Sequence, residues 1–436
     1  MGDKKSFRHI LKGDKVIWTI YFFLCLISII EVYSAASTLS FRSGDHWGPI
    51  INHLINMVLG AVIVWGVHLV PCRWFKVLPI LLIPLSIILL IVVYLIGAAT
   101  NDAARWIPIL GFQFQPSEMA KAAVIITTAM ILAAMQDEKQ ANPKAFKYIL
   151  IITMIICALI APENLSTAAL LFGVVFLMMF IGRVSMKQLG KLVAWIGGAL
   201  ALIVALIMII PDEPEDEIVT TDIETVDDAP VKKKEKGLGL LHRGRTWKHR
   251  IEGFFADNDS TYDESLRGEN AQVVCAKTAI STSNFFGKMP GNSELTDLLP
   301  QPYSDFIYAI IVEEMGFVGG FFVVLLYVIL LIRAGRIASR SERKFPAFLI
   351  MGIAILMVSQ AILNMLVVVG LFPVTGQPLP LISRGGSAIV INCFYFGIML
   401  SVSRYVIKKQ ELKAGIQTAE PEKAMTNEYY NDENMQ

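Results

Sequence analysis

Residues 299–320 read LPQPYSDFIYAIIVEEMGFVGG, a stretch that places three acidic residues at the start of and within an apolar segment. A polar run with two prolines ends in a carboxylate, Asp305, and an apolar helix is predicted to begin directly after it. Two more acids, Glu313 and Glu314, follow about two and a half helical turns further on. Because ionisable groups at membrane depth are costly, each is a candidate functional group. A helix N-cap would also explain the acid at Asp305.

The composition predicts a membrane protein. The 436 residues are 55% hydrophobic and only 17% charged, with a mean hydropathy of +0.57. Many apolar segments approach the roughly 20 residues that span a bilayer. We therefore predict an all-α polytopic membrane protein with ten transmembrane helices. The ten segments are 16–36, 50–70, 76–98, 117–135, 147–161, 164–181, 188–210, 305–332, 346–371 and 380–406.

The distribution of Lys and Arg predicts the orientation of these segments. With ten spans and both termini cytoplasmic, the loops on the inner side carry most of the cations. The opposite short loops are almost free of them, with Arg42 and Arg105 as exceptions. This alternation follows the positive-inside rule, and merging the fifth and sixth segments would destroy it.

The chain outside the spans divides into three parts. Residues 1–15 are predicted to be a cytoplasmic N-terminus, and 411–436 a disordered cytoplasmic tail after a membrane domain at 16–410. A long loop, 211–304, falls on the outside. Its first part is acidic and predicted to be disordered. Its basic part, which contains Arg245, is either a solvated surface or a contact for lipid phosphates.

A second motif precedes the fourth span. Arg105 suits a membrane interface, and Gln115, Pro116 and Ser117 indicate a helix start. Glu118 lies in the first turn, where its charge suits the helix dipole. Glu118 and Lys121 are three residues apart and can pair on one helix face. Either the pair neutralises two charges that enter the membrane, or Lys121 binds an anion in a cavity and Glu118 tunes it.

A third motif, GLFPVTGQPLPLISRGGS at 370–387, carries prolines and glycines at membrane depth. Non-helical backbone is tolerated there only where it lines a cavity or is buried in protein. Arg384 beside Gly385, Gly386 and Ser387 places a cation near free amides at a helix start, which suits a phosphate or pyrophosphate. A re-entrant loop with structural glycines is the alternative. Between the fifth and sixth spans, helix capping explains the polar residues of PENLST at 162–167.

Together, QPSEMAK at 115–121, the stretch at 299–320 and the third motif resemble the FtsW/RodA (SEDS) family of bacterial cell-wall proteins. The resemblance covers nearly the whole chain. TGQPLPLISRGGS is more similar to FtsW, the division member, than to RodA, the elongation member. Gln301 and Tyr303 depart from the glutamate and histidine of the family, PENLST replaces PDLGT, and Arg384 stands where an uncharged residue is common.

The resemblance implies a peptidoglycan glycosyltransferase of the bacterial inner membrane that polymerises lipid II at the outer face during cell division. Its expected partners are a class B penicillin-binding protein transpeptidase and other division proteins, and we expect no nucleic acid among them. The essential aspartate of the family matches Asp305, and its glutamate–lysine pair matches Glu118 and Lys121.

The chemistry then requires a base and positive charge. Asp305 is the expected general base in an inverting transfer. Arg105, Lys121, Arg245, Arg384 or a divalent cation (Mg²⁺ or Mn²⁺) would stabilise the departing pyrophosphate. The five scattered cysteines predict neither a disulfide nor a metal site.

The residues are also compatible with two other functions. A lipid II flippase would line a polar path with acidic, histidine and amide side chains inside the membrane. These are Glu31, His53, Glu313, Glu314 and Asn364. A non-enzymatic scaffold would only recruit a transpeptidase.

Overall fold

The structure, a computed structural model, describes residues 12–43, 48–100, 107–109, 112–137, 140–209, 271–293 and 304–413. These residues contain ten long helices, and each overlaps one of the ten predicted segments. The helices are α2 (Lys15–Ser43), α3 (Gly48–Leu69), α4 (Leu78–Thr100), α5 (Pro116–Ala134), α6 (Pro143–Ile160), α7 (Leu165–Ile181), α8 (Met186–Ile209), α13 (Ile307–Arg340), α14 (Lys344–Val368) and α15 (Gly386–Lys413).

Eight of these helices are long and apolar enough to cross a membrane, and α7 is a shorter apolar helix of 17 residues. The polytopic helical class is therefore confirmed, whereas the number and direction of crossings stay predictions. The remaining described elements are short. They are a 3₁₀ helix (Cys72–Lys76), the antiparallel strands β1 (Ile107–Ile109) and β2 (Phe112–Phe114), and helix α11 (Ala271–Thr282).

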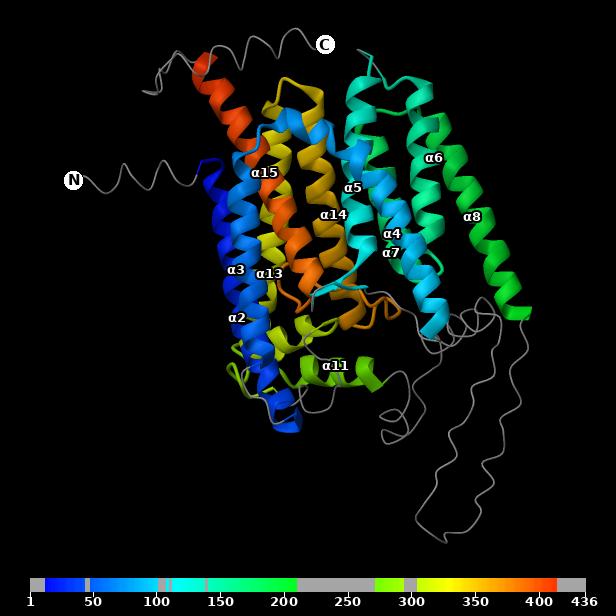
Figure 1. Cartoon of the computed structure of the whole chain (residues 1–436). Helices are drawn as coiled ribbons and strands as arrows, with labels where there is room; N and C mark the ends of the chain where they lie inside the picture. The colour runs from blue at the N-terminus through cyan, green and yellow to red at the C-terminus, as the bar shows by residue number, and fades with distance from the viewer. Residues whose placement is uncertain are drawn as a thin grey trace, which may run out of the picture.

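The long helices run side by side, and the start of α2 and the end of α15 lie at the same end of the bundle (Figure 1). At the opposite end, α11 lies across the bundle rather than along it (Figure 1). Cys275 and Ala279 of α11 share a hydrophobic cluster with Phe306, the N-cap residue of α13, and with Ile310 of α13. The structure therefore caps one end of the bundle with a helix that belongs to the predicted outer loop.

At the end of the bundle that holds both described termini, cationic side chains bond neighbouring segments to each other. Arg333 donates to Asp14 with its Nε at 2.8 Å from Oδ2. Lys344 Nζ donates to the Gln136 carbonyl at 2.8 Å. Because this end carries the cationic loops, its charge agrees with the predicted cytoplasmic side.

The separation of the fifth and sixth segments is confirmed. Helix α6 ends at Ile160 and α7 begins at Leu165. Asn164 caps α7, because its side chain accepts a hydrogen bond from the Thr167 amide at 3.0 Å. The capping interpretation of PENLST is thus correct for Asn164.

The centre of the bundle is formed by α5, α14 and α15, whose spans are mostly buried. Helices α3 and α4 instead expose most of their apolar side chains, such as Val58, Trp65, Ile80 and Leu81. An apolar surface of this kind suits lipid. The motif residues of α5 and α15 therefore lie inside the protein and away from lipid.

Two predicted boundaries were wrong. The last span does not begin at residue 380, because α15 starts at Gly386, and the preceding span ends at Val368 rather than 371. Residues 369–385 are non-helical. Gly370, with a φ of 75°, ends α14, because the Leu371 amide bonds back to the Leu366 carbonyl at 2.9 Å. Pro373, Pro378 and Pro380 then lack the amide that would resume a helix. We call residues 369–385 the re-entrant segment.

Candidate active site

The re-entrant segment begins exposed, at Val369, Leu371 and Phe372, and is largely buried in protein from Thr375 to Ser383. Thr375, Gln377, Leu381 and Ser383 are at most 5% exposed. Non-helical backbone at this depth must find hydrogen-bond partners inside the protein. Tyr327 of α13 supplies one of them by donating to the Pro380 carbonyl at 2.5 Å.

Asp305 lies two residues before the start of α13 and is partly buried. The N-cap residue of α13 is Phe306, so the N-cap interpretation of Asp305 is wrong. Its carboxylate oxygen Oδ1 accepts a hydrogen bond from Ser304 Oγ at 2.9 Å. Its backbone is held from two sides, because Asn364 Nδ2 donates to the Asp305 carbonyl at 2.7 Å and Ser383 Oγ donates to the Ser304 carbonyl at 2.6 Å. Helix α14 and the re-entrant segment thus fix where this carboxylate lies.

Glu118 and Lys121 form a buried ion pair at the start of α5. Lys121 Nζ lies 2.8 Å from Glu118 Oε1, and the lysine side chain is 0% exposed. Lys121 also donates to Gln360 Oε1 at 3.0 Å. This geometry is that of the charge-neutralising pair, the first of the two alternatives given by the sequence.

Gln377 joins the re-entrant segment to α7 and α14. Its Nε2 donates to Thr167 Oγ1 at 2.5 Å, and its carbonyl accepts from Asn364 Nδ2 at 2.8 Å. Thr167 belongs to the PENLST motif, so this motif, the third motif and α14 meet here. Sequence reasoning missed Gln360 and Gln377. An available signal was the placement of amides four residues apart on an apolar helix, Gln360 and Asn364.

The second half of the third motif forms the start of α15. Arg384 is partly buried, and Gly385 and Gly386 lead into the helix. Ser387 is buried and its Oγ accepts a hydrogen bond from the Gln115 amide at 3.1 Å. Gln115, followed by the buried Pro116 and Ser117, begins α5 as predicted. The starts of α5 and α15 are therefore tied together beside Arg384.

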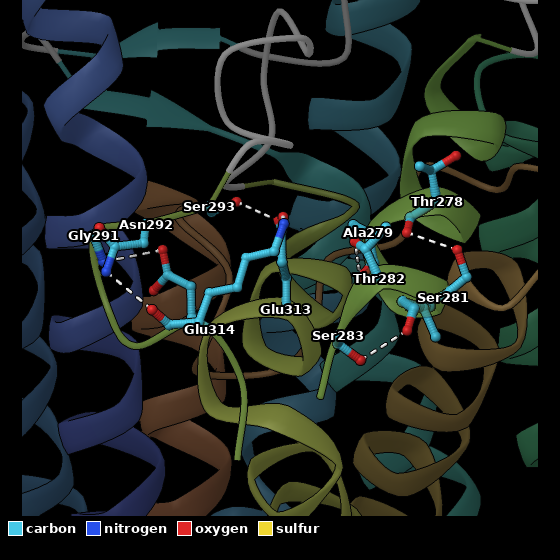
Figure 2. Close-up of polar contacts among 12 residues, drawn as sticks. Thr278, Ala279, Ser281, Thr282, Ser283, Gly291, Asn292, Ser293, Glu313 and Glu314 are labelled. Carbon is cyan, nitrogen blue, oxygen red and sulfur yellow. Dashed lines mark hydrogen bonds and ion pairs between the residues drawn. The ribbon is translucent and has the colours of Figure 1, made fainter. Parts of the chain in front are cut away.

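The two glutamates of α13 hold residues 283–293 against the bundle (Figure 2). Glu313 accepts from Lys288 Nζ at 2.9 Å and from Ser293 Oγ at 2.6 Å. Glu314 accepts from the Ser34 hydroxyl and from the Gly291 amide. Both side chains are at most 1% exposed. Glu314 therefore anchors the outer segment, which is a structural role; its place in the polar path of a flippase stays a prediction.

Gly316 bends α13 at the same place. Its φ of 69° is not helical, and the bend leaves carbonyls of the preceding turn free to bond elsewhere. The Glu313 and Glu314 carbonyls accept from the Lys288 and Met289 amides, both at 2.9 Å. The sequence predicted an unbroken span here.

Some predicted groups lie outside the described residues. They are Arg105, Arg245, most of the outer loop 211–304 and most of the C-terminal tail. Within the described ranges, no group of three or more His, Cys, Asp and Glu side chains could hold a metal ion.

The fold and the site define a multi-pass membrane protein. Its polar site lies at the end of the bundle opposite both described termini, where a buried re-entrant segment meets a carboxylate. The FtsW/RodA/SpoVE family model, described as cell cycle protein, matches residues 14–408, and the chain belongs to this family. It is thus a multi-pass protein of the bacterial inner membrane, as the sequence predicted.

Curated relatives cover most of the chain. A probable peptidoglycan glycosyltransferase FtsW of Geobacter sp. (strain M18) is 29% identical over 91% of this chain and 98% of its own. A protein of the same name from Taylorella equigenitalis is 32% identical over 70% of this chain and 74% of its own.

Solved structures share the fold. A chain of a peptidoglycan synthase complex that coordinates polymerization and crosslinking is similar with a TM-score of 0.67 and 20% identity, over 90% of this chain and 98% of that chain. The rod shape determining protein RodA of Thermus thermophilus is similar with a TM-score of 0.58 and 19% identity, over 90% and 97% of the two chains.

Proposed function

We propose that this protein is a peptidoglycan glycosyltransferase that polymerises lipid II during cell division. The observation that carries the proposal is the position of Asp305. Asn364 donates to its carbonyl, Ser383 donates to the carbonyl of the preceding Ser304, and the residue as a whole stays partly exposed. A carboxylate that is fixed at a site's edge can act as a general base. The names of the curated relatives support the same activity.

The reaction needs one proton acceptor. The 4-hydroxyl of the acceptor sugar attacks the anomeric carbon of the donor, and the bond from that carbon to the pyrophosphate oxygen breaks. Asp305 takes the hydroxyl proton, and the pyrophosphate leaves with the bonding electron pair. A single displacement inverts the α-linked donor to a β-linked product, so one carboxylate is chemically sufficient.

Arg384 is the best-placed cation for the leaving group among the described candidates. It follows Ser383 directly, and Ser383 is bonded to Ser304, the residue before Asp305. Asp305 follows Ser304 and Arg384 follows Ser383, so the hydrogen bond between the two serines brings the base and the cation close together. The free amides at the start of α15 add partial positive charge near Arg384. Lys121 is fully buried and already paired, so it suits this task less well.

A divalent cation stays part of the proposal only as a substrate-borne ion. Mg²⁺ commonly binds through one or two carboxylates, substrate phosphates and water. The pyrophosphate oxygens and water would be its ligands, because Asp305 is needed as the base and the described residues hold no group of three or more His, Cys, Asp and Glu side chains for a metal.

We further propose a class B penicillin-binding protein as the partner that crosslinks the product. A solved structure with the same fold is a chain of a synthase complex that couples polymerization to crosslinking, which supports this pairing. A polymerase that releases linear strands needs such a partner to make a network.

The test is polymer synthesis from labelled lipid II by the purified protein in detergent, with and without the transpeptidase. Wild type is expected to make long glycan strands and Asp305→Asn only a small residual amount, since an amide cannot accept the proton. Strands from Asp305→Asn at the wild-type rate would show that Asp305 is not the base. No strands from any folded complex would favour the flippase, which needs no polymer chemistry.

A further inference from the structure

Helix α14 presents two amide side chains to the site. Gln360 and Asn364 are four residues apart and therefore lie on one face of the helix. They are 2% and 1% exposed. The rest of the described helix is largely apolar, so these two amides are the main polar groups of its buried middle.

Both amides donate to backbone carbonyls of the re-entrant segment. Gln360 Nε2 lies 3.0 Å from the Pro378 carbonyl, and Asn364 Nδ2 lies 2.8 Å from the Gln377 carbonyl. Carbonyls of non-helical backbone at membrane depth cost several kcal/mol when they lack a donor. The two amides thus stabilise the path of the segment beside the site.

The same side chains also reach Asp305 and the buried ion pair of α5. Asn364 Nδ2 also donates to the Asp305 carbonyl at 2.7 Å, and Gln360 Oε1 accepts from Lys121 Nζ at 3.0 Å. A continuous path therefore runs from the Glu118–Lys121 pair through Gln360 and the re-entrant segment to Asn364 and Asp305.

We propose that Gln360 and Asn364 are positioning residues for Asp305, and that the Glu118–Lys121 pair acts on the reaction through Gln360 rather than by touching pyrophosphate. This inference rests on the proposed function. Asn364 fixes the backbone that carries the base. Gln360 fixes the Pro378 carbonyl. The ion pair fixes the orientation of Gln360, because Lys121 donates to the amide oxygen and the amide nitrogen therefore faces the Pro378 carbonyl.

The direct test is steady-state kinetics with lipid II on the purified full chain bound to its transpeptidase, for Asn364→Leu and Gln360→Met. Both variants keep approximate side-chain volume and remove the donors. Misplacing a reacting group by about 1 Å costs on the order of 100-fold. We expect kcat to fall about 10- to 100-fold for Asn364→Leu and less for Gln360→Met, with KM within about twofold of wild type.

Ser401→Ala is the matched control. Ser401 is 1% exposed and donates to the Val70 carbonyl at 2.6 Å, in the half of α15 remote from the site. Its removal also deletes a buried donor to a backbone carbonyl, but kcat per folded molecule is expected to stay at the wild-type value.

A double variant separates positioning from a direct role. If Asn364 acts only through Asp305, Asp305→Asn with Asn364→Leu should retain the same residual rate as Asp305→Asn alone. A further loss in the double variant would overturn the proposal. A raised KM with unchanged kcat would also overturn it, because the amide would then bind substrate.

The two levels of failure are distinguishable. Inactive Asp305→Asn together with wild-type kcat in Asn364→Leu would overturn positioning and leave the proposed function standing. Wild-type activity in Asp305→Asn would instead overturn the proposed base, and the positioning inference with it. If Asn364→Leu and Gln360→Met yield less folded protein but keep the wild-type kcat per folded molecule, the two amides only stabilise the fold and the positioning proposal is overturned.

Discussion

Replacing Gly316 by alanine is expected to separate residues 283–293 from α13. Gly316 has φ of 69° and ψ of −171°, a region that is essentially restricted to glycine and costs other residues about 1–3 kcal/mol. An added Cβ would lie 2.3 Å from the Phe285 carbonyl oxygen and 2.4 Å from the Gly287 amide nitrogen. Both contacts are backbone atoms, so no flexible side chain can move to relieve them.

The loss can be worked from the contacts that would break. Moving the segment away removes the backbone hydrogen bonds from Lys288 to Glu313, from Met289 to Glu314 and from Val318 to Phe285. Each such bond contributes about 1 kcal/mol net. With the cost of the backbone conformation, Gly316→Ala is expected to destabilise the folded state by roughly 4–6 kcal/mol.

The assay is thermal unfolding of the purified protein in detergent, combined with amide hydrogen exchange over residues 283–293. Gly335→Ala is the matched control, because Gly335 lies in the same helix and a Cβ there would meet no atom within 4 Å. It is expected to stabilise the helix by about 0.5–1 kcal/mol. Unchanged unfolding and unchanged exchange in Gly316→Ala would refute the close contact between the two backbones.

The other predictions concern buried polar pairs and are measured by the same unfolding assay. Lys121→Met leaves the Glu118 charge buried without its cation and is expected to lower the free energy of unfolding by about 3–5 kcal/mol. The double variant with Glu118→Gln should recover most of this loss. A Lys121→Met variant as stable as wild type would contradict the ion pair. Tyr327→Phe removes the donor of the Pro380 carbonyl and should cost about 1–3 kcal/mol. Tyr148→Phe, at a half-exposed position, should stay within about 0.5 kcal/mol, and equal losses in both tyrosine variants would argue against the hydrogen bond.

The amino-acid sequence alone determined the class of the protein and the positions of its long helices. Runs of apolar residues at 16–36 or 346–371 are local signals, because each segment must satisfy its own backbone inside a membrane. The division at Pro162 was likewise readable, since charge alternation and a capping residue both mark it. Three motifs with their spacing were enough to indicate the family.

The partners of the site residues were decided by the tertiary structure. Asp305 looked like an N-cap by local sequence, but contacts with Asn364 and Ser383, distant in the chain, hold its backbone. Lys121 could pair locally or bind an anion, and the approach of Gln360 from another helix completes the pair.

The bend at Gly316 was hidden for a similar reason. A glycine within an apolar run is compatible with a continuous helix, and only the approach of Gly287 from the outer segment requires a glycine with positive φ. Hydrophobic periodicity reports which residues avoid water. It does not report which helix faces which, because that depends on packing between segments hundreds of residues apart. Local sequence therefore determines the helices of this protein, and the packing between them determines the site.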